Sequence, residues 1–287
     1  MNKVISVVLL AVFILTGIPT SPAHAQEGAG GESEAEKMAK KLSNPVASLI
    51  SVPIQVNYDE GIGLADGYKI SANIQPVIPI SLNQDWNLIS RTIVPIVSQE
   101  DIVGLPVKTP QGVQIVDSGH QSGVGDILQS VFFSPKEPTA GGLIWGAGPV
   151  FLIPSASDEL LGGEKFGLGP TAVVLKQEKG WTYGALANHV WSVSGDDERK
   201  DVSATFLQPF LSYSTKKATT FLVNTESTYD WEGETWSVPV NFGVSQLFKV
   251  GGQLVQVGGF ARYWAETPDS GPEGWGARVV VTFLFPT

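Results

Sequence analysis

Alternation of apolar and polar residues with a period of two constrains this chain more than any other feature. It begins near residue 48 and recurs in twelve segments, most of them ten to fourteen residues long. Such alternation is typical of half-buried β-strands. Globular strands usually have about five or six residues, whereas a tilted strand that crosses a bilayer needs about 9–11. The pattern therefore predicts an all-β fold, a transmembrane antiparallel β-barrel of about 12 strands, rather than a soluble sandwich.

The connections between the predicted strands alternate between a longer and a shorter set. The strands are predicted at residues 48–58, 68–80, 86–97, 123–134, 142–153, 166–177, 181–192, 202–214, 218–228, 235–248, 253–264 and 274–285. Nineteen of the 28 acidic residues lie in the longer connections. Outer-membrane barrels have an even number of strands, short periplasmic turns and longer extracellular loops. The longer connections, at 59–67, 98–122, 154–165, 193–201, 229–234 and 265–273, are therefore predicted to lie outside the cell.

The first 25 residues have the pattern of a secretory signal peptide. Lys3 supplies a positive charge, residues 4–15 are almost wholly apolar, and Ala23-His24-Ala25 forms a small-residue cleavage site. Cleavage is expected after Ala25, which leads to export and to the outer membrane. Residues 26–44 are polar, with a short helical stretch near 32–42, and are predicted to form a periplasmic tether or plug. The barrel itself is predicted at 45–287.

Composition excludes several classes of function. The net charge is −10, with a pI near 4.8, and a nucleic-acid binder needs a basic face instead. The chain has no cysteine, which excludes disulfides, thiol catalysis and cysteine-ligated zinc. No phosphate-binding or dinucleotide motif is present. We expect no cofactor and no bound metal.

Prolines and aromatic residues qualify the strand pattern. Proline cannot donate to a β-ladder and is normally confined to edges and bulges. Bulges or breaks are therefore expected at the in-strand residues Pro53, Pro76, Pro95, Pro149, Pro170, Pro209 and Pro239. Aromatic residues gather near strand ends, as in the two interfacial girdles of a membrane barrel. The predicted girdle residues are Tyr58, Tyr68, Trp86, Trp181, Tyr183, Trp191, Tyr213, Tyr229, Trp231, Trp236, Trp264 and Trp275.

Strand parity places a set of polar side chains in the lumen. The candidate selectivity residues are Arg91, Asn188, Asn224, Glu226, Asn241, Arg262 and Arg278. Two interpretations remain open: a structural network that fills the barrel, or a zone that selects solutes. Arg262 and Arg278 fall on neighbouring strands, and Glu226 is expected to pair with one of them but not with both. The second arginine would then need Asp126, whose facing is undetermined, or an incoming anion.

Long segments of the chain resemble one family of Gram-negative outer-membrane proteins. They include LSNPVASLISVPIQVNYDEGIG, NIQPVIPISLNQDWNLISRTIVPI and RYWAETPDSGPEGWGARVVVTFLFP. The family is labelled as transporters of the phenol-degradation meta-pathway, and its members often carry the misleading name neuromedin U. The resemblance covers roughly residues 42–286. It implies an outer-membrane channel or transporter for small, hydrophobic or aromatic solutes. No catalytic residues carry over from the family.

Two alternative functions follow from the residues themselves. The first is a structural or adhesive barrel, whose acidic loops would bind lipopolysaccharide through divalent cations. The second is an outer-membrane lipid hydrolase using His189. Ser192 is predicted to point away from His189, so the pairing of nucleophile and base fails. We therefore predict a protein that is not an enzyme, with outer-membrane lipid, lipopolysaccharide and a small solute as its partners.

Overall fold

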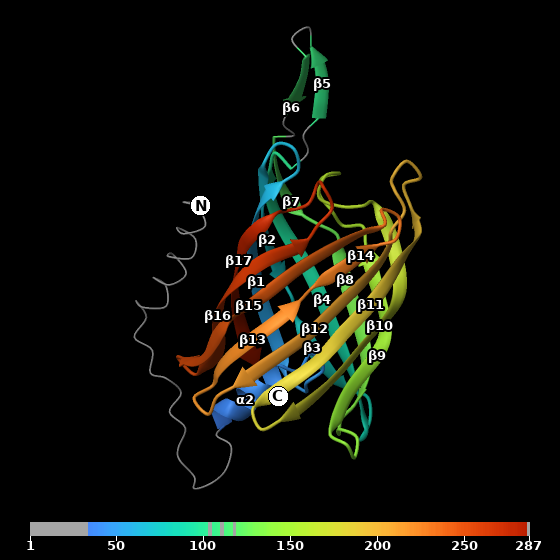
Figure 1. Ribbon diagram of the computed structural model, residues 1–287. Coiled ribbons are helices and arrows are strands. Elements are labelled where there is room, and N and C mark those ends of the chain that lie inside the picture. Colours follow the sequence, from blue (N-terminus) through green and yellow to red (C-terminus); the bar gives the residue numbers. More distant parts are fainter. Residues whose placement is uncertain (1–33, 103–104, 110–111, 117–118, 286–287) are drawn as a thin grey trace.

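A computed structural model describes residues 34–102, 105–109, 112–116 and 119–285 of the chain (Figure 1). The predicted signal peptide and residues 26–33 lie outside the described residues. One helix, α2 (Glu34–Leu42), falls within the stretch expected to be helical. Among the described residues, no helix is long and apolar enough to cross a membrane.

The strands form a closed antiparallel barrel, which confirms the predicted fold class. Their bounds are β1 (Ile50–Ile62), β2 (Gly67–Ile74), β3 (Val77–Ser81), β4 (Trp86–Glu100), β5 (Leu105–Thr109), β6 (Gly112–Val116), β7 (His120–Val124), β8 (Ile127–Pro135), β9 (Leu143–Ile153), β10 (Lys165–Glu178), β11 (Trp181–Gly195), β12 (Ser203–Ser214), β13 (Thr219–Thr225), β14 (Ser227–Asp230), β15 (Thr235–Val250), β16 (Gln253–Glu266) and β17 (Gly274–Phe285). Three barrel strands are each split into two segments, namely β2 with β3, β7 with β8, and β13 with β14. Counting each split pair as one strand gives a barrel of twelve strands. β5 and β6 form a separate hairpin within the predicted 98–122 connection.

The barrel closes where its first strand meets its last. β1 pairs with β17 in unbroken register from Ile50↔Phe285 to Tyr58↔Ala277. Closure leaves no unpaired strand edge, and inside a bilayer every backbone polar group must find such a partner within the protein. Apolar side chains such as Val174, Val223 and Phe242 are exposed on the outer face, whereas polar residues such as Asn57 and Asn241 are buried on the inner face. This arrangement is inverted relative to a soluble protein and suits a lipid surround.

Three of the expected proline irregularities coincide with the split strands. Pro76 separates β2 from β3, and Pro95 accepts a hydrogen bond from the backbone of Gly125 at the break between β7 and β8. Pro239 lies at a register shift between β15 and β16 and accepts a hydrogen bond from the backbone of Glu226, between β13 and β14. Each break thus faces or contains a residue that cannot complete the ladder.

The other prolines divide into two groups. Pro53 and Pro209 lie on the strands that face the breaks after β2 and β13. Pro149 and Pro170 face each other in the β9–β10 ladder, where the register does not shift. The expected irregularity lies in the flanking ladders instead: the β10–β11 register skips from Leu168↔Trp191 to Thr171↔Asn188, and the β8–β9 register skips from Ser130↔Val150 to Phe133↔Ala147. Facing residues in an antiparallel ladder alternate between hydrogen-bonded and non-hydrogen-bonded pairs. In a non-hydrogen-bonded pair neither backbone N–H bonds to the facing residue, so two prolines can face each other there.

The two ends of the barrel differ in their connections, as predicted. α2 and the short turns lie at one end, and most of the longer connections lie at the other (Figure 1). Two connections are shorter than expected. β1 continues to Ile62 and β14 to Asp230, which leaves only residues 63–66 and 231–234 outside the strands. Alternation could not locate those ends because polar rim residues continue the ladder beyond the apolar band.

The closed ladder leads to a first prediction. The folded protein in dodecyl sulfate should migrate faster before boiling than after it, because a fully paired barrel resists detergent unfolding. Electrophoresis of paired samples measures the shift, and tryptophan fluorescence confirms that the unboiled sample is folded. Equal migration of folded and boiled samples would contradict a closed barrel.

Candidate functional site in the lumen

A cluster of buried charges occupies the lumen, and Glu226 is at its centre. Glu226 lies between β13 and β14, where the strand is interrupted. Its carboxylate accepts hydrogen bonds from Arg278 Nη1 at 2.8 Å and from Nη2 at 2.6 Å. Arg278 Nε donates to Asn57 Oδ1 at 2.7 Å. This bidentate geometry makes a strong charge-assisted ion pair and fixes the plane of the Arg278 guanidinium.

Arg262 completes the cluster from the neighbouring strand β16. Its Nε lies 2.9 Å from Asp59 Oδ1, and its Nη1 lies 3.5 Å from Glu226 Oε2. The guanidinium carbon is 4.5 Å from the centre of the Trp264 ring, a cation–π distance. The Trp264 indole donates to Asp59 Oδ1 at 2.8 Å. One carboxylate and one aromatic face therefore hold Arg262 in addition to Glu226.

These contacts correct the expectation that one arginine lacks a partner. Glu226 contacts both Arg262 and Arg278, and Asp59 supplies a second carboxylate. Asp59 and Glu226 thus give each arginine a carboxylate partner, so neither arginine requires an incoming anion. The prediction for Trp264 is also wrong. Its place near a strand end predicts an interfacial girdle, but its ring points inward to Arg262 and Asp59.

Asp126 serves a different purpose from the one considered for it. Its carboxylate accepts hydrogen bonds from the backbone N–H groups of Ser155, Ala156 and Gly163, at 3.1, 3.1 and 2.7 Å. It therefore anchors the 154–164 loop and contacts neither arginine. Gln99, which is 1% exposed, donates to the carbonyl of Leu160 in that loop at 3.1 Å. These contacts hold the loop against β4 at the end of the barrel that carries the longer connections.

Arg91 lies apart from the cluster, at a cavity of about 190 Å³. Its Nη2 donates to Gln75 Oε1 at 2.9 Å. Among the described residues, none has a carboxylate within 4.0 Å of Arg91. Gln208 also lines the cavity and donates to Glu226 Oε1 at 3.4 Å. Polar contacts therefore run from Asp59 through Arg262, Glu226 and Gln208 to the cavity.

The three asparagine candidates are not all brought together. Asn224 on β13 faces Asn241 on β15 in the ladder, and Arg262 Nη1 donates to Asn241 Oδ1 at 3.3 Å. Asn224 Oδ1 and Asn241 Nδ2, an acceptor and a donor, are both buried and have no hydrogen-bond partner among the described residues. Asn188 lies on β11, across the barrel from β17 in the strand order. It therefore belongs to the opposite wall and not to the charge cluster.

The segment before β1, residues 43–49, fills the lumen near the short turns; we call it the plug segment. Ala47 and Leu49 pack with Leu247 and Leu284 of the wall, and Val46 packs in a second apolar cluster that includes Phe132. Asn87 Nδ2 donates to Ser48 Oγ at 2.8 Å. The plug segment therefore contacts two separate wall regions and narrows the passage.

The outward histidine contacts Thr205 and Trp191. His189 Nδ1 is 2.7 Å from Thr205 Oγ1, and its ring centre is 4.0 Å from that of Trp191. His189 Nε2 is buried and has no hydrogen-bond partner within the part of the chain that the structure describes. Ser192 instead donates to Asp201 at 3.0 Å. A nucleophile must lie beside its base, and Ser192, as predicted, does not pair with His189.

Comparison with known proteins supports the fold. No protein-family model and no curated protein matches the sequence. A crystal structure of an outer-membrane channel from Pseudomonas putida F1 superimposes with a TM-score of 0.61 and 12% identity, over 83% of this chain and 96% of that one. The NanC porin superimposes with a TM-score of 0.48 and 11% identity, over 81% and 98%. The likeness to the Pseudomonas putida F1 channel shows that the chain has the fold of an outer-membrane β-barrel.

Proposed function

We propose that this protein is an outer-membrane channel that passes small solutes through a narrow lumen. The observation that carries the proposal is the line of polar contacts from Asp59 to the cavity beside Arg91. A barrel used only as an anchor has no need of a cavity beside a buried cation. Twelve strands fall between eight, whose lumen side chains fill, and sixteen, which leave an open aqueous pore. Passage should accordingly be restricted in size.

The neighbouring fold and the sequence resemblance support a narrower version of the proposal. The Pseudomonas putida F1 protein is an outer-membrane channel. Membership of the meta-pathway transporter family, and with it aromatic or hydrophobic solutes, is part of what we propose. Membrane lipid and lipopolysaccharide are the proposed partners, and the exposure of Trp181, Trp191, Trp231 and Trp275 supports contact with them.

The adhesive alternative has weaker support. It requires free acidic loops, yet ion pairs join Asp201 to Lys165 at 3.0 Å and Asp230 to Lys200 at 3.1 Å. Lys165 lowers the pKa of the Asp201 carboxyl, with a further hydrogen bond from Ser192. These carboxylates are already engaged by lysines and are therefore less available to bridging cations.

Reconstitution in liposomes tests the proposal and separates it from its alternatives. Osmotic swelling with glycerol and arabinose should exceed that of protein-free liposomes, and swelling with a trisaccharide should not. Bilayer ion currents on the same sample provide a second measure of passage. Swelling and currents equal to the protein-free control would overturn the channel and favour an adhesive barrel. Turnover of a lipid ester by the same sample would instead indicate a hydrolase.

A further inference from the structure

We propose that the cavity beside Arg91 binds a small organic carboxylate, with the carboxylate on Arg91 and the organic body against the plug segment. This inference rests on the proposed function and names the class of solute. The cavity lies between the plug segment and the walls formed by β1, β3, β4, β12, β16 and β17. At about 190 Å³ it exceeds the space of a single water and admits a small organic molecule.

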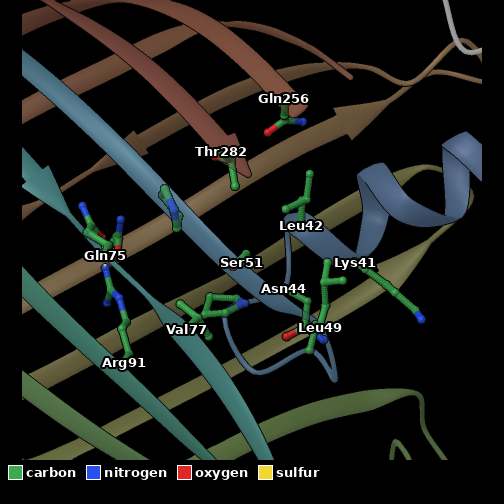
Figure 2. A pocket seen from close by; sticks show the side chains of 14 residues that line it. Lys41, Leu42, Asn44, Leu49, Ser51, Gln75, Val77, Arg91, Gln256 and Thr282 are labelled. Atoms are coloured by element: carbon green, nitrogen blue, oxygen red, sulfur yellow. Dashed lines mark hydrogen bonds between the residues drawn. The ribbon is translucent and has the colours of Figure 1, made fainter. Parts of the chain in front are cut away.

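The charges that line the cavity all have the same sign. Arg91 and Lys41 line it, and none of the other described residues that line it is an aspartate or glutamate. Figure 2 shows Arg91 beside Gln75 at one side of the cavity and Lys41 at the opposite side, near the end of α2. The clustered arginines differ, because each has a carboxylate within 3.0 Å. Arg91 is attracted by Glu226 from beyond 4.0 Å, without contact, and is therefore the lumen arginine open to direct pairing with an incoming anion.

Arg91 retains donors for a ligand. A guanidinium carries five N–H groups, and the described hydrogen bonds of Arg91 use only Nη2, toward Gln75. A buried charge without a paired counter-charge is costly, and a bound carboxylate would remove that cost through charge-assisted hydrogen bonds. Gln75, held by its own bond to Arg91, restricts the orientation of the guanidinium.

The remaining lining explains why the ligand should be organic. Leu42, Leu49, Pro53 and Val77 provide apolar surface, while Gln256 and Thr282 provide amide and hydroxyl groups. Sites for small molecules are typically apolar with a few placed polar groups. An inorganic anion would satisfy Arg91 but leave the apolar side solvated. A carboxylate with an apolar body, such as an aromatic acid, satisfies both sides.

Binding to the purified full-length mature protein in detergent tests the assignment. The probes are benzoate, its neutral analogue benzamide, and acetate, which lacks the ring; saturation-transfer NMR titrations give each Kd. Arg91→Gln should weaken benzoate binding about tenfold or more, the scale of a lost charge-assisted hydrogen bond, and should leave benzamide within about twofold. Arg91→Lys should retain a preference for benzoate over benzamide. The electrophoretic shift on boiling verifies that each variant is folded.

Lys69→Gln is the matched control. Lys69 faces Asp59 in the β1–β2 ladder and does not line the cavity, so the variant removes the same charge from the lumen elsewhere. Benzoate affinity should stay within about twofold. If Lys69→Gln and Arg91→Gln weakened benzoate binding equally, the site would be overturned, because the overall positive electrostatic potential of the lumen would then account for the binding. Equal affinity of the wild-type protein for benzoate and for acetate would overturn the apolar part. If Arg91→Gln left benzoate binding unchanged while the protein still conducted ions, the carboxylate site would be rejected and the proposed channel function would stand.

Discussion

Replacing Glu226 with glutamine should destabilise the barrel by about 3–5 kcal/mol, the scale for breaking a buried ion pair. The carboxylate accepts two hydrogen bonds from Arg278 and lies 3.5 Å from Arg262. Glutamine keeps the shape but removes the charge, so two buried guanidiniums would share Asp59 as their nearest acid. Urea unfolding followed by tryptophan fluorescence, in detergent or lipid, measures the free energy of unfolding.

Two further variants make this result specific. Glu232→Gln removes the same charge from the exposed 231–234 turn and should change stability by no more than about 0.5 kcal/mol. Combining Glu226→Gln with Arg278→Gln should cost less than the sum of the single changes, because the second substitution removes the stranded cation. Additive losses, or equal losses for Glu226→Gln and Glu232→Gln, would show that the pairing does not stabilise the fold.

Deleting residues 34–47 should raise single-channel conductance by about an order of magnitude, since the emptied lumen of a twelve-stranded barrel is wider than the plugged one. The plug segment contacts two separate apolar clusters in the wall, and its removal takes Val46 and Ala47 away from both. Planar-bilayer recordings measure the change. Deleting residues 34–42, which removes α2 but keeps the plug segment, is the matched control and should have a smaller effect. Equal conductance in the wild type and the longer deletion would show that the constriction lies elsewhere.

A cysteine pair can test whether the plug segment must move for solute to pass. Val46 Cγ1 lies 3.2 Å from the position that a Cβ on Gly146 would occupy, within reach of a disulfide. The chain has no cysteine of its own, so Val46→Cys with Gly146→Cys can cross-link only that pair. If passage requires displacement, oxidation should suppress swelling with arabinose and reduction should restore it. Rates independent of redox state would indicate passage around a fixed plug.

Much of the fold could be predicted because period-two alternation reports directly on which face of a strand meets lipid. The twelve strands and their order follow from it. Alternation does not predict the split strands or the extension of β1 and β14 beyond the apolar band. Both depend on which residue of the neighbouring strand each backbone group faces. Pro149 and Pro170 illustrate this: they face each other in regular register, a pairing that neither local sequence reveals.

The site was less predictable because its partners are distant along the chain. Parity placed Glu226, Arg262 and Arg278 on the inner face, but Asp59 was assigned to a loop. Trp264 was assigned to the lipid interface because it lies near a strand end. The extension of β1 beyond Tyr58 turns Asp59 inward, where it meets Arg262. Only the full register of the closed sheet brings residues so far apart in sequence within 3.0 Å of each other.

The seam between β1 and β17 has a consequence for how the barrel is made. Its two strands are the first and last of the barrel, so the cylinder cannot shut until the final strand has been delivered. The plug segment directly precedes β1 and is tethered to one side of that seam. It can therefore be laid against the open, curving sheet and enclosed as the final strand docks, instead of being threaded into a finished cylinder. Closure of the seam itself would load the interior.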